Sequence, residues 1–349
     1  MTPPIADNEL DVYCANGVGV GRAPADIVDM RKESKEEEVD EEVEHQPSKM
    51  KPQGTTTTSM PYRSFVAASE TNRATSIAVT PSERNTILNK ASEVFPGLMT
   101  ANVLSQKLDL VLKDKANFTR ESTLLATSLC CDEVNREFED SLRDIYGCNF
   151  SMGGLAGFAF GGITSFGAMA HHIPTNGSCL IVYGPHVGID KDGVVGKLNR
   201  LGRPGPSGAC CGSATAAYGY CQMVLNGECK ERKVNPDDFV DAQQVMVGNA
   251  LLLRHGQRLK DAPVPEVELP YALFDCQDDL MQRIVAKGCG EVATDTATPE
   301  GTGGKIALLG GIQINTPNGM SEYFLPQKFV LLNNKGELVA DLLEDLNEA

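Results

Sequence analysis

Residues 127–136, TSLCCDEVNR, place two thiols, a carboxylate and a guanidinium within one short stretch. The thiols belong to Cys130 and Cys131, the carboxylate to Asp132 and the guanidinium to Arg136. Zinc prefers sulfur and nitrogen ligands, and an aspartate paired with an arginine keeps a low pKa and accepts protons. The stretch is therefore either half of a metal site or a buried strand end that happens to contain cysteine.

Two more groups with the same chemistry follow along the chain. His186 stands in GPHVGI, and Cys210 and Cys211 precede a glycine in ACCGSATAA. All three groups lie at chain reversals after apolar segments, where α/β proteins build their sites. Two thiolates and one imidazole would leave zinc a fourth, open position, as in catalytic zinc sites. Each residue also has an ordinary interpretation, since a buried cysteine often packs as a small hydrophobe.

Asp132 and Arg136 are four residues apart, so on a helix they would face the same side. We expect them to pair, with Asp132 either orienting water at a metal or closing the fourth position itself. Arg200 and Arg203 are alternative partners for Asp132. The ordinary alternative is a helix-surface ion pair, with Asp132 capping the helix.

The adjacent residues His171 and His172 follow a glycine-rich apolar segment. Successive side chains diverge, so at most one of the two would bind a metal. We expect one to pack against its neighbours and the other to face solvent. A proton relay through them is an alternative hypothesis.

The segments around these groups predict the elements that must position them. Buried strands are predicted at 124–129, 178–184, 305–315 and 328–334. Helices are predicted at 132–147, from 212 onward and at 237–256. This alternation indicates an α/β fold with a mainly parallel sheet flanked by helices.

The uncharged segment 148–170 is long enough to span a membrane, but it contains six glycines. We therefore expect a buried, tightly packed segment and no membrane span. Residues 1–80 are predicted to form a disordered acidic tail, because 31–45 carries eight acids against three bases. Residues 81–349 are predicted to form the zinc-binding domain.

The charge balance of 31 basic and 47 acidic residues, net −16, argues against nucleic acid and anionic membranes as partners. The 11 cysteines do not form the framework of a small secreted domain, and they favour a reducing compartment. The amino terminus shows no signal-peptide pattern. A cytoplasmic location is the expectation from these features.

Four motifs in this order resemble the limiting-CO2-inducible B protein family: TSLCCDEVNR, GGLAGFAFGGITSFGAMAHHIP, GPHVGIDKDGVVGK and ACCGSATAA. That family is grouped with theta-type carbonic anhydrases, and its active site is similar to that of beta-type carbonic anhydrases. The resemblance covers about residues 85–335, which is nearly all of the predicted folded part.

The resemblance implies a zinc ion held by Cys130, His186 and Cys211, with Asp132 and Arg136 as catalytic residues. Cys131 and Cys210 remain alternative ligands, each one position away. The implied activity is reversible hydration of carbon dioxide to bicarbonate by a zinc-activated hydroxide. A homodimer, or a pairing with a family paralogue, is also implied, and so is a plastid as an alternative compartment.

Two other functions stay open at this point. The first is a catalytically silent zinc-binding subunit of a complex that handles inorganic carbon. The second is a hydrolase with Cys130 or Cys211 as nucleophile and His186 as its base.

Overall fold

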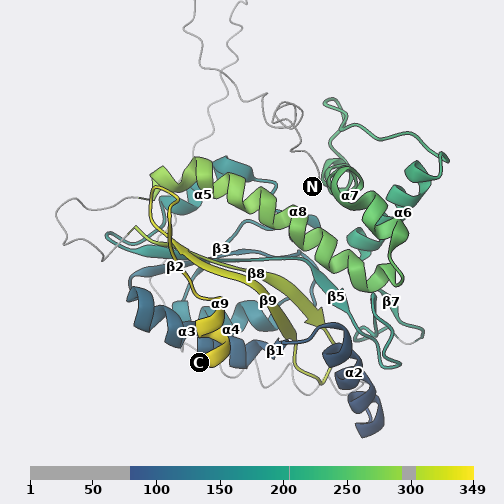
Figure 1. Ribbon diagram of the computed structural model, residues 1–349, viewed down its shortest axis with the longest axis horizontal. Helices are drawn as coiled ribbons and strands as arrows, with labels where there is room; N and C mark the ends of the chain where they lie inside the picture. The colour runs from purple at the N-terminus through teal and green to yellow at the C-terminus, as the bar shows by residue number, and fades with distance from the viewer. Residues whose placement is uncertain (1–78, 204, 293–303) are drawn as a thin grey trace, which may run out of the picture. The chain divides into compact units, whose positions relative to one another are not determined.

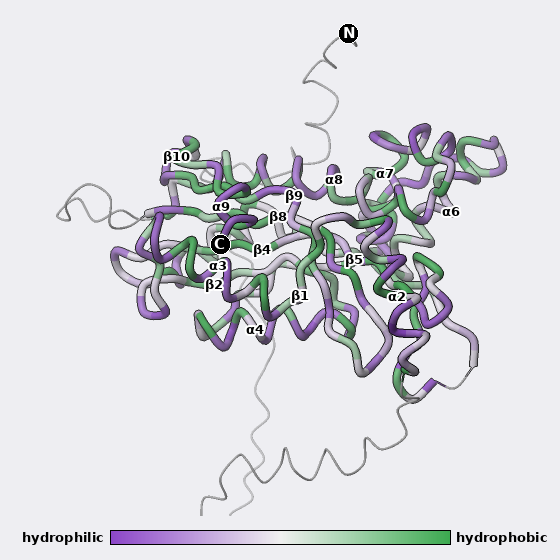
Figure 2. Tube along the Cα trace, turned by 60° about the horizontal axis from the view of Figure 1, so that its bottom comes forward, coloured by the Kyte–Doolittle hydropathy of each residue, from purple (hydrophilic) through white to green (hydrophobic). Residues whose placement is uncertain are grey.

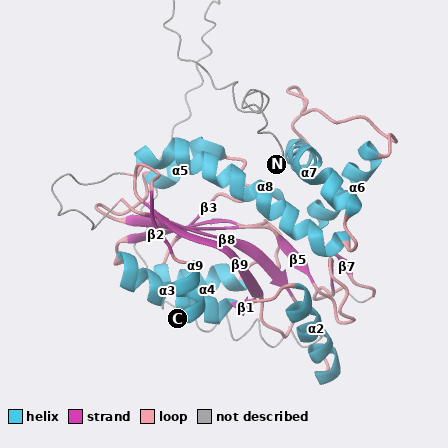
Figure 3. Ribbon diagram, viewed as in Figure 1, coloured by secondary structure: helices cyan, strands magenta, loops and turns pink. Residues whose placement is uncertain are grey.

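The computed structural model describes residues 79–203, 205–292 and 304–349. In this part of the chain a mixed sheet lies between two layers of helices (Figure 1, Figure 3). The predicted acidic tail lies outside the described residues, except for Val79 and Thr80.

The main sheet has the strand order β1-β9-β8-β4-β2-β3, with β10 beside β9 and β5 beside β8. Its strands are β1 Met99–Thr100, β2 Thr123–Ser128, β3 Asn149–Ser151, β4 Ser178–Tyr183, β5 His186–Gly188, β8 Ile306–Asn315, β9 Tyr323–Leu332 and β10 Leu338–Asp341. Strands β3, β2, β4, β8 and β5 are parallel, whereas β9 returns antiparallel to β8 and pairs with β1 and β10. The predicted α/β class with a mainly parallel sheet is confirmed. The last predicted strand is the antiparallel β9.

The central strands are apolar without alternation because helices cover both of their faces. Every residue of β4 and of β8 is buried, and in β2 only Leu124 is partly exposed. Figure 2 shows the hydrophobic colour gathered in the middle of the sheet and the hydrophilic colour on the outer helices.

The helices form a layer on each face of the sheet (Figure 1). One layer packs on the core with Leu125, Leu180 and Leu309, and contains α3 Ala101–Ala116, α4 Glu137–Tyr146 and α9 Leu343–Glu348. The other layer packs on the core with Ile181 and Leu308, and contains α5 Gly162–Ala170 and α8 Pro265–Gly288. Helix α2 Pro81–Val94 adds side chains to the same core.

A third core joins α8 to two further helices and to the candidate site. It contains side chains from α6 Gly212–Leu225 and α7 Ala242–Asp261, together with Cys130 and Cys211. The remaining elements are η1 Leu155–Gly157, η2 Cys289–Glu291 and the two-stranded sheet β6 Lys197–Leu198 with β7 Gly208–Ala209.

Local sequence explains where the first helix begins. Helix α2 has a complete capping box, in which Thr80 accepts from the backbone N–H of Glu83 and the Glu83 carboxylate accepts from the N–H of Thr80. Pro81 occupies the first turn, where no N–H is required.

The glycine-rich segment 148–170 forms β3, η1 and α5. A Cβ at Gly153 would lie 2.0 Å from the carbonyl oxygen of Leu129, and one at Gly157, which has φ +89°, would lie 2.4 Å from that of Gly184. Glycine is therefore required here because two backbones approach closely. Close packing agrees with the prediction, but burial is only partial, since Ile163 on α5 is exposed. None of the helices in the described ranges is both long and apolar enough to cross a membrane.

The buried carboxyl group of Glu322 gives a first prediction. Burial raises its pKa from the usual 4.5 to about 7, and its Oε2 accepts from the N–H of Phe138 at 3.3 Å. The folded chain therefore binds more protons than the unfolded chain between these values, so stability falls as pH rises from about 4.5 to about 7. Glu322→Gln should remove this loss and stabilise the fold at pH 8 by about 1–3 kcal/mol.

Urea unfolding at pH 5 and pH 8 measures the effect, with Glu121→Gln as an exposed control. If the stability of Glu322→Gln falls between pH 5 and pH 8 as much as that of the wild type, this interpretation of Glu322 is contradicted.

Candidate metal centre

The three predicted ligands meet at the carboxyl ends of the parallel strands. Cys130 lies two residues after β2, His186 begins β5 directly beyond β4, and Cys211 is the residue before α6. After β2 the chain continues to β3, which pairs with β2 on one flank. After β4 it continues toward β8, which pairs with β4 on the other flank. The carboxyl ends of such diverging strands form the crevice in which α/β proteins bind ligands.

The donor atoms of this group fit one tetrahedral metal ion. One donor atom each of Cys130, His186 and Cys211 lies within 4.8 Å of the others, and all three residues are buried. The Cys130 and Cys211 sulfurs are 4.0 Å apart. Two sulfurs on tetrahedral zinc would be about 3.8 Å apart, given Zn–S bonds of about 2.3 Å.

The imidazole of His186 offers one free nitrogen. Its Nδ1 lies 2.7 Å from Oδ1 of Asn315, whereas Nε2 is buried and has no hydrogen-bond partner in the described structure. A buried polar atom without a partner is costly, and a metal ion at Nε2 would remove that cost. The donor set therefore fits zinc in type, number and separation.

The two thiols influence each other strongly. The pKa of Cys130 rises to about 12, first because of its hydrogen bond with Cys211 and second because of burial. The pKa of Cys211 is lowered, first by the same hydrogen bond and also by the backbone N–H groups of Ser213 and Ala214 at the start of α6. One thiolate thus forms readily, but the second requires a nearby cation.

Asp132 pairs with Arg200 rather than with Arg136. The guanidinium of Arg200 holds both carboxylate oxygens at 2.8 Å, and it also contacts Glu133. Although burial raises it, the pKa of Asp132 stays well below its usual range, chiefly because of Arg200. Oδ2 of Asp132 lies 3.9 Å from Nε2 of His186, so an ionised carboxylate stands beside the candidate metal position.

The predicted Asp132–Arg136 pairing is wrong because the residues do not share a helix. Helix α4 begins at Glu137, and the preceding turn is held by hydrogen bonds to Asp132, whose carbonyl accepts from the N–H of Asn135 at 3.3 Å. Asp132 therefore does not cap a helix. Arg136 contacts Glu139 and donates to the carbonyl oxygens of Cys130 at 2.8 Å and Asp132 at 3.2 Å. It holds the backbone around the first thiol.

The two neighbouring cysteines lie in different surroundings from the predicted ligands. Cys131 is exposed. Cys210 is buried, with its sulfur 3.6 Å from Nδ1 of His186. A second group that could hold a metal contains Asp132, His186 and Cys210. The choice between Cys210 and Cys211 as ligand therefore depends on which nitrogen of His186 is free.

Two other predicted residues lie away from this centre. His171 and His172 are both exposed, and they precede β4, at the opposite edge of the sheet from the candidate site. Nδ1 of His171 lies 2.7 Å from the carbonyl oxygen of Gly167, and the ring of His172 packs against Phe150. A proton relay from these residues to the candidate site has no support in this arrangement.

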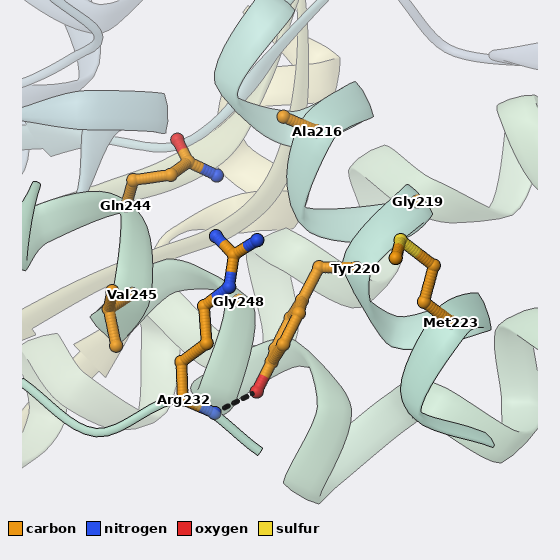
Figure 4. A pocket seen from close by; sticks show the side chains of 8 residues that line it. All are labelled: Ala216, Gly219, Tyr220, Met223, Arg232, Gln244, Val245 and Gly248. Carbon is orange, nitrogen blue, oxygen red and sulfur yellow. Dashed lines mark hydrogen bonds between the residues drawn. The ribbon is translucent and has the colours of Figure 1, made fainter. Parts of the chain in front are cut away.

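A hollow of about 620 Å³ opens beside the thiols. Its lining includes Cys131, Leu155, Arg203 and Gly212, together with the Asp132–Arg200 pair. A second hollow of about 270 Å³ lies between α6 and α7, where Arg232 stacks over the ring of Tyr220 (Figure 4). None of the residues that line the second hollow belongs to the groups that could hold a metal.

The comparisons with known proteins agree with this geometry. A family model described as Limiting CO2-inducible proteins B/C beta carbonic anhydrases matches residues 98–333, well over half of the chain. The chain belongs to this family. The match includes every residue of the candidate centre named above.

Solved structures of this limiting-CO2-inducible family are similar over most of the chain. The crystal structure of PtLCIB4, a homolog of the limiting CO2-inducible protein LCIB, is 39% identical, covers 73% of this chain and 100% of its own, and has a TM-score of 0.66. The structure of LCIB itself is 19% identical, covers 70% of this chain and 93% of its own, and has a TM-score of 0.52. The likeness to LCIB shows the fold alone. A search of curated proteins found no match to the chain.

One residue of this centre was not foreseen from the sequence. Asn315 is buried at the carboxyl end of β8, where its side chain contacts His186. The sequence does contain a signal for Asn315. A polar residue that ends a long apolar strand lies at the same edge of the sheet as the other groups.

The Arg200 pairing gives a second prediction. Arg200→Met should raise the pKa of Asp132, because burial would then act on this carboxyl group without a bidentate cation. Arg136→Met is the matched control and should leave that pKa unchanged, since Arg136 contacts only the backbone of Asp132. Carbon-13 NMR of aspartate-labelled, zinc-free protein over a pH titration measures both variants. A shift in the Arg136→Met variant alone would contradict the pairing described here.

Proposed function

We propose that this chain is a zinc carbonic anhydrase, which hydrates carbon dioxide to bicarbonate reversibly. Cys130, His186 and Cys211 hold the metal in this proposal. A zinc ion bound there would supply a nucleophile near neutral pH, because it lowers the pKa of bound water to about 7. Membership of the carbonic anhydrase-like family supports the reaction class.

One observation favours an active enzyme over a catalytically silent zinc-binding protein. Both oxygens of Asp132 are held by Arg200, so the carboxylate is directed to the guanidinium and not into the metal's fourth position. Cys130, Asp132 and Cys211 all line the 620 Å³ hollow, so a metal held there would be open to it, and an open position distinguishes catalytic zinc from structural zinc.

Asp132 would accept a hydrogen bond beside this open position. It is ionised across the physiological range because of Arg200, and it lies 3.9 Å from Nε2 of His186. An ionised carboxylate there accepts a hydrogen bond from the attacking water and fixes its lone pair toward the substrate carbon. Arg200 keeps this acceptor charged and directed.

The hollow suits a small linear substrate. Leu155 and Leu201 provide apolar lining for carbon dioxide, while Arg203 and the start of α6 at Gly212 place positive potential near the bicarbonate product. Carbon dioxide and bicarbonate are thus the proposed substrate and product. A homodimer or a pairing with a paralogue stays a prediction, and so do the cytoplasmic and plastid locations.

The activity itself provides the third prediction. Purified protein with about one zinc per chain should hydrate carbon dioxide in stopped-flow assays between pH 7 and 9. Cys130→Ala and His186→Ala should lose both zinc and turnover. Asp132→Asn should keep zinc but lose roughly 10²–10⁴-fold in turnover, which is the usual contribution of a positioned proton acceptor.

The control for these variants is Cys148→Ala, which removes an exposed thiol before β3 and should keep full zinc and turnover. Full zinc content without turnover at any pH would contradict the enzyme and favour the silent zinc-binding subunit. Turnover without zinc would favour a cysteine nucleophile.

Zinc uptake gives a fourth prediction. Without metal, the raised pKa of Cys130, about 12, leaves its thiol protonated at pH 7.5. Burial lowers the pKa of His186, but the neighbouring thiols of Cys130 and Cys210 raise it above its ordinary value. Zinc uptake should therefore release more than one proton per ion, and zinc should be lost as pH falls.

Calorimetric titration of zinc-free protein, in two buffers of different ionisation enthalpy, measures the released protons. Zinc uptake that releases no protons would contradict the assignment of these ligands.

A further inference from the structure

The two nitrogens of His186 have opposite surroundings. The side chain is fully buried, Nδ1 faces Oδ1 of Asn315 at 2.7 Å, and Nε2 has no hydrogen-bond partner within residues 79–203, 205–292 and 304–349. A neutral imidazole carries its proton on one nitrogen only, so its neighbours decide which nitrogen can bind a metal.

The amide of Asn315 can face His186 in one orientation only. Its Nδ2 donates to the carbonyl oxygen of Val134 at 3.1 Å and to Oδ1 of Asn135 at 3.1 Å. A backbone carbonyl only accepts, so a flipped amide would place two oxygens against each other. Oδ1 of Asn315 is therefore the atom that faces Nδ1, and Nδ1 must carry the proton.

The sheet fixes this amide in place. Asn315 is the last residue of β8, opposite Gly188 of the parallel strand β5, which begins with His186. Its carbonyl accepts from the N–H of Ile189 at 2.9 Å. The amide and the imidazole thus lie on adjacent, hydrogen-bonded strands.

Cys210 completes the surroundings of Nδ1. Its sulfur lies 3.6 Å from Oδ1 of Asn315 and 3.6 Å from Nδ1 of His186. It is therefore on the side of the ring that carries the proton, and its S–H donates to Asn315. The sulfur of Cys211 lies instead beside that of Cys130.

We propose that Asn315 is a positioning residue, which holds His186 as the Nδ1–H tautomer and so directs the lone pair of Nε2 to the metal, with Cys210 as its hydrogen-bond donor rather than a ligand. This inference rests on the zinc site proposed above. A carboxylate or carbonyl oxygen behind a metal-binding histidine fixes its tautomer, and loss of such a partner weakens metal binding roughly 10- to 100-fold.

The test compares Asn315→Leu with Asn315→Asp. Asn315→Leu removes the acceptor and should bind zinc roughly 10- to 100-fold more weakly in competition with a chromophoric chelator. Asn315→Asp keeps an acceptor oxygen toward Nδ1 but places its second oxygen against the carbonyl of Val134, so its affinity should fall less than that of Asn315→Leu. Asn249→Leu, which removes an amide on α7 that contacts Tyr220 and Arg232, should leave the affinity unchanged.

Nitrogen-15 NMR of the five histidines gives a second readout that needs no turnover. In the zinc-loaded wild type, the His186 signal, assigned with His186→Gln, should show a protonated Nδ1. Folded Asn315→Leu with wild-type zinc affinity and the same tautomer would overturn the role of Asn315 alone. A wild-type chain that takes up no zinc would instead overturn the proposed function on which the inference rests.

Discussion

Two buried thiols lie 4.0 Å apart, beside a buried imidazole nitrogen that has no hydrogen-bond partner among the described residues, and they set the main electrostatic constraint on this molecule. The second thiolate cannot form next to the first without a cation, because burial and the neighbouring sulfur both favour the protonated form. A divalent metal ion reverses this balance, and a tetrahedral ion needs donors at these separations. The centre is thus arranged for a metal before any metal binds.

The fold meets this constraint by ending several parallel strands at one place. Strands β2, β4 and β8 are buried on both faces, so their carboxyl ends are rigid supports for Cys130, His186 and Asn315. The loop after β2 is held by Arg136, and the segment that carries Arg200 returns to pair with Asp132. Asp132 and Arg136 are thus each held by a charged partner, Arg200 and Glu139 respectively.

The apolar runs predicted the sheet and placed both cysteine pairs and His186 at chain reversals, whereas the choice of Cys130 and Cys211 came from the family resemblance. Arg200 was only an alternative partner for Asp132, because four-residue spacing favours Arg136 on a helix, and here the residues between them form a turn. The turn is stabilised by hydrogen bonds from side chains to distant backbone, including Asn315 to Val134. Such contacts depend on the pairing of strands that are distant in the sequence, and the spacing of apolar residues does not indicate that pairing.

X-ray absorption at the zinc edge of the purified wild-type chain tests the central claim most directly. We expect two sulfur ligands at about 2.3 Å, from Cys130 and Cys211, and two nitrogen or oxygen ligands at about 2.0–2.1 Å. One of these is His186, and the other is a ligand from outside the protein at the open fourth position. Three or four sulfur ligands would contradict it, because Cys210 or Cys131 would then close the position on which the proposed reaction depends.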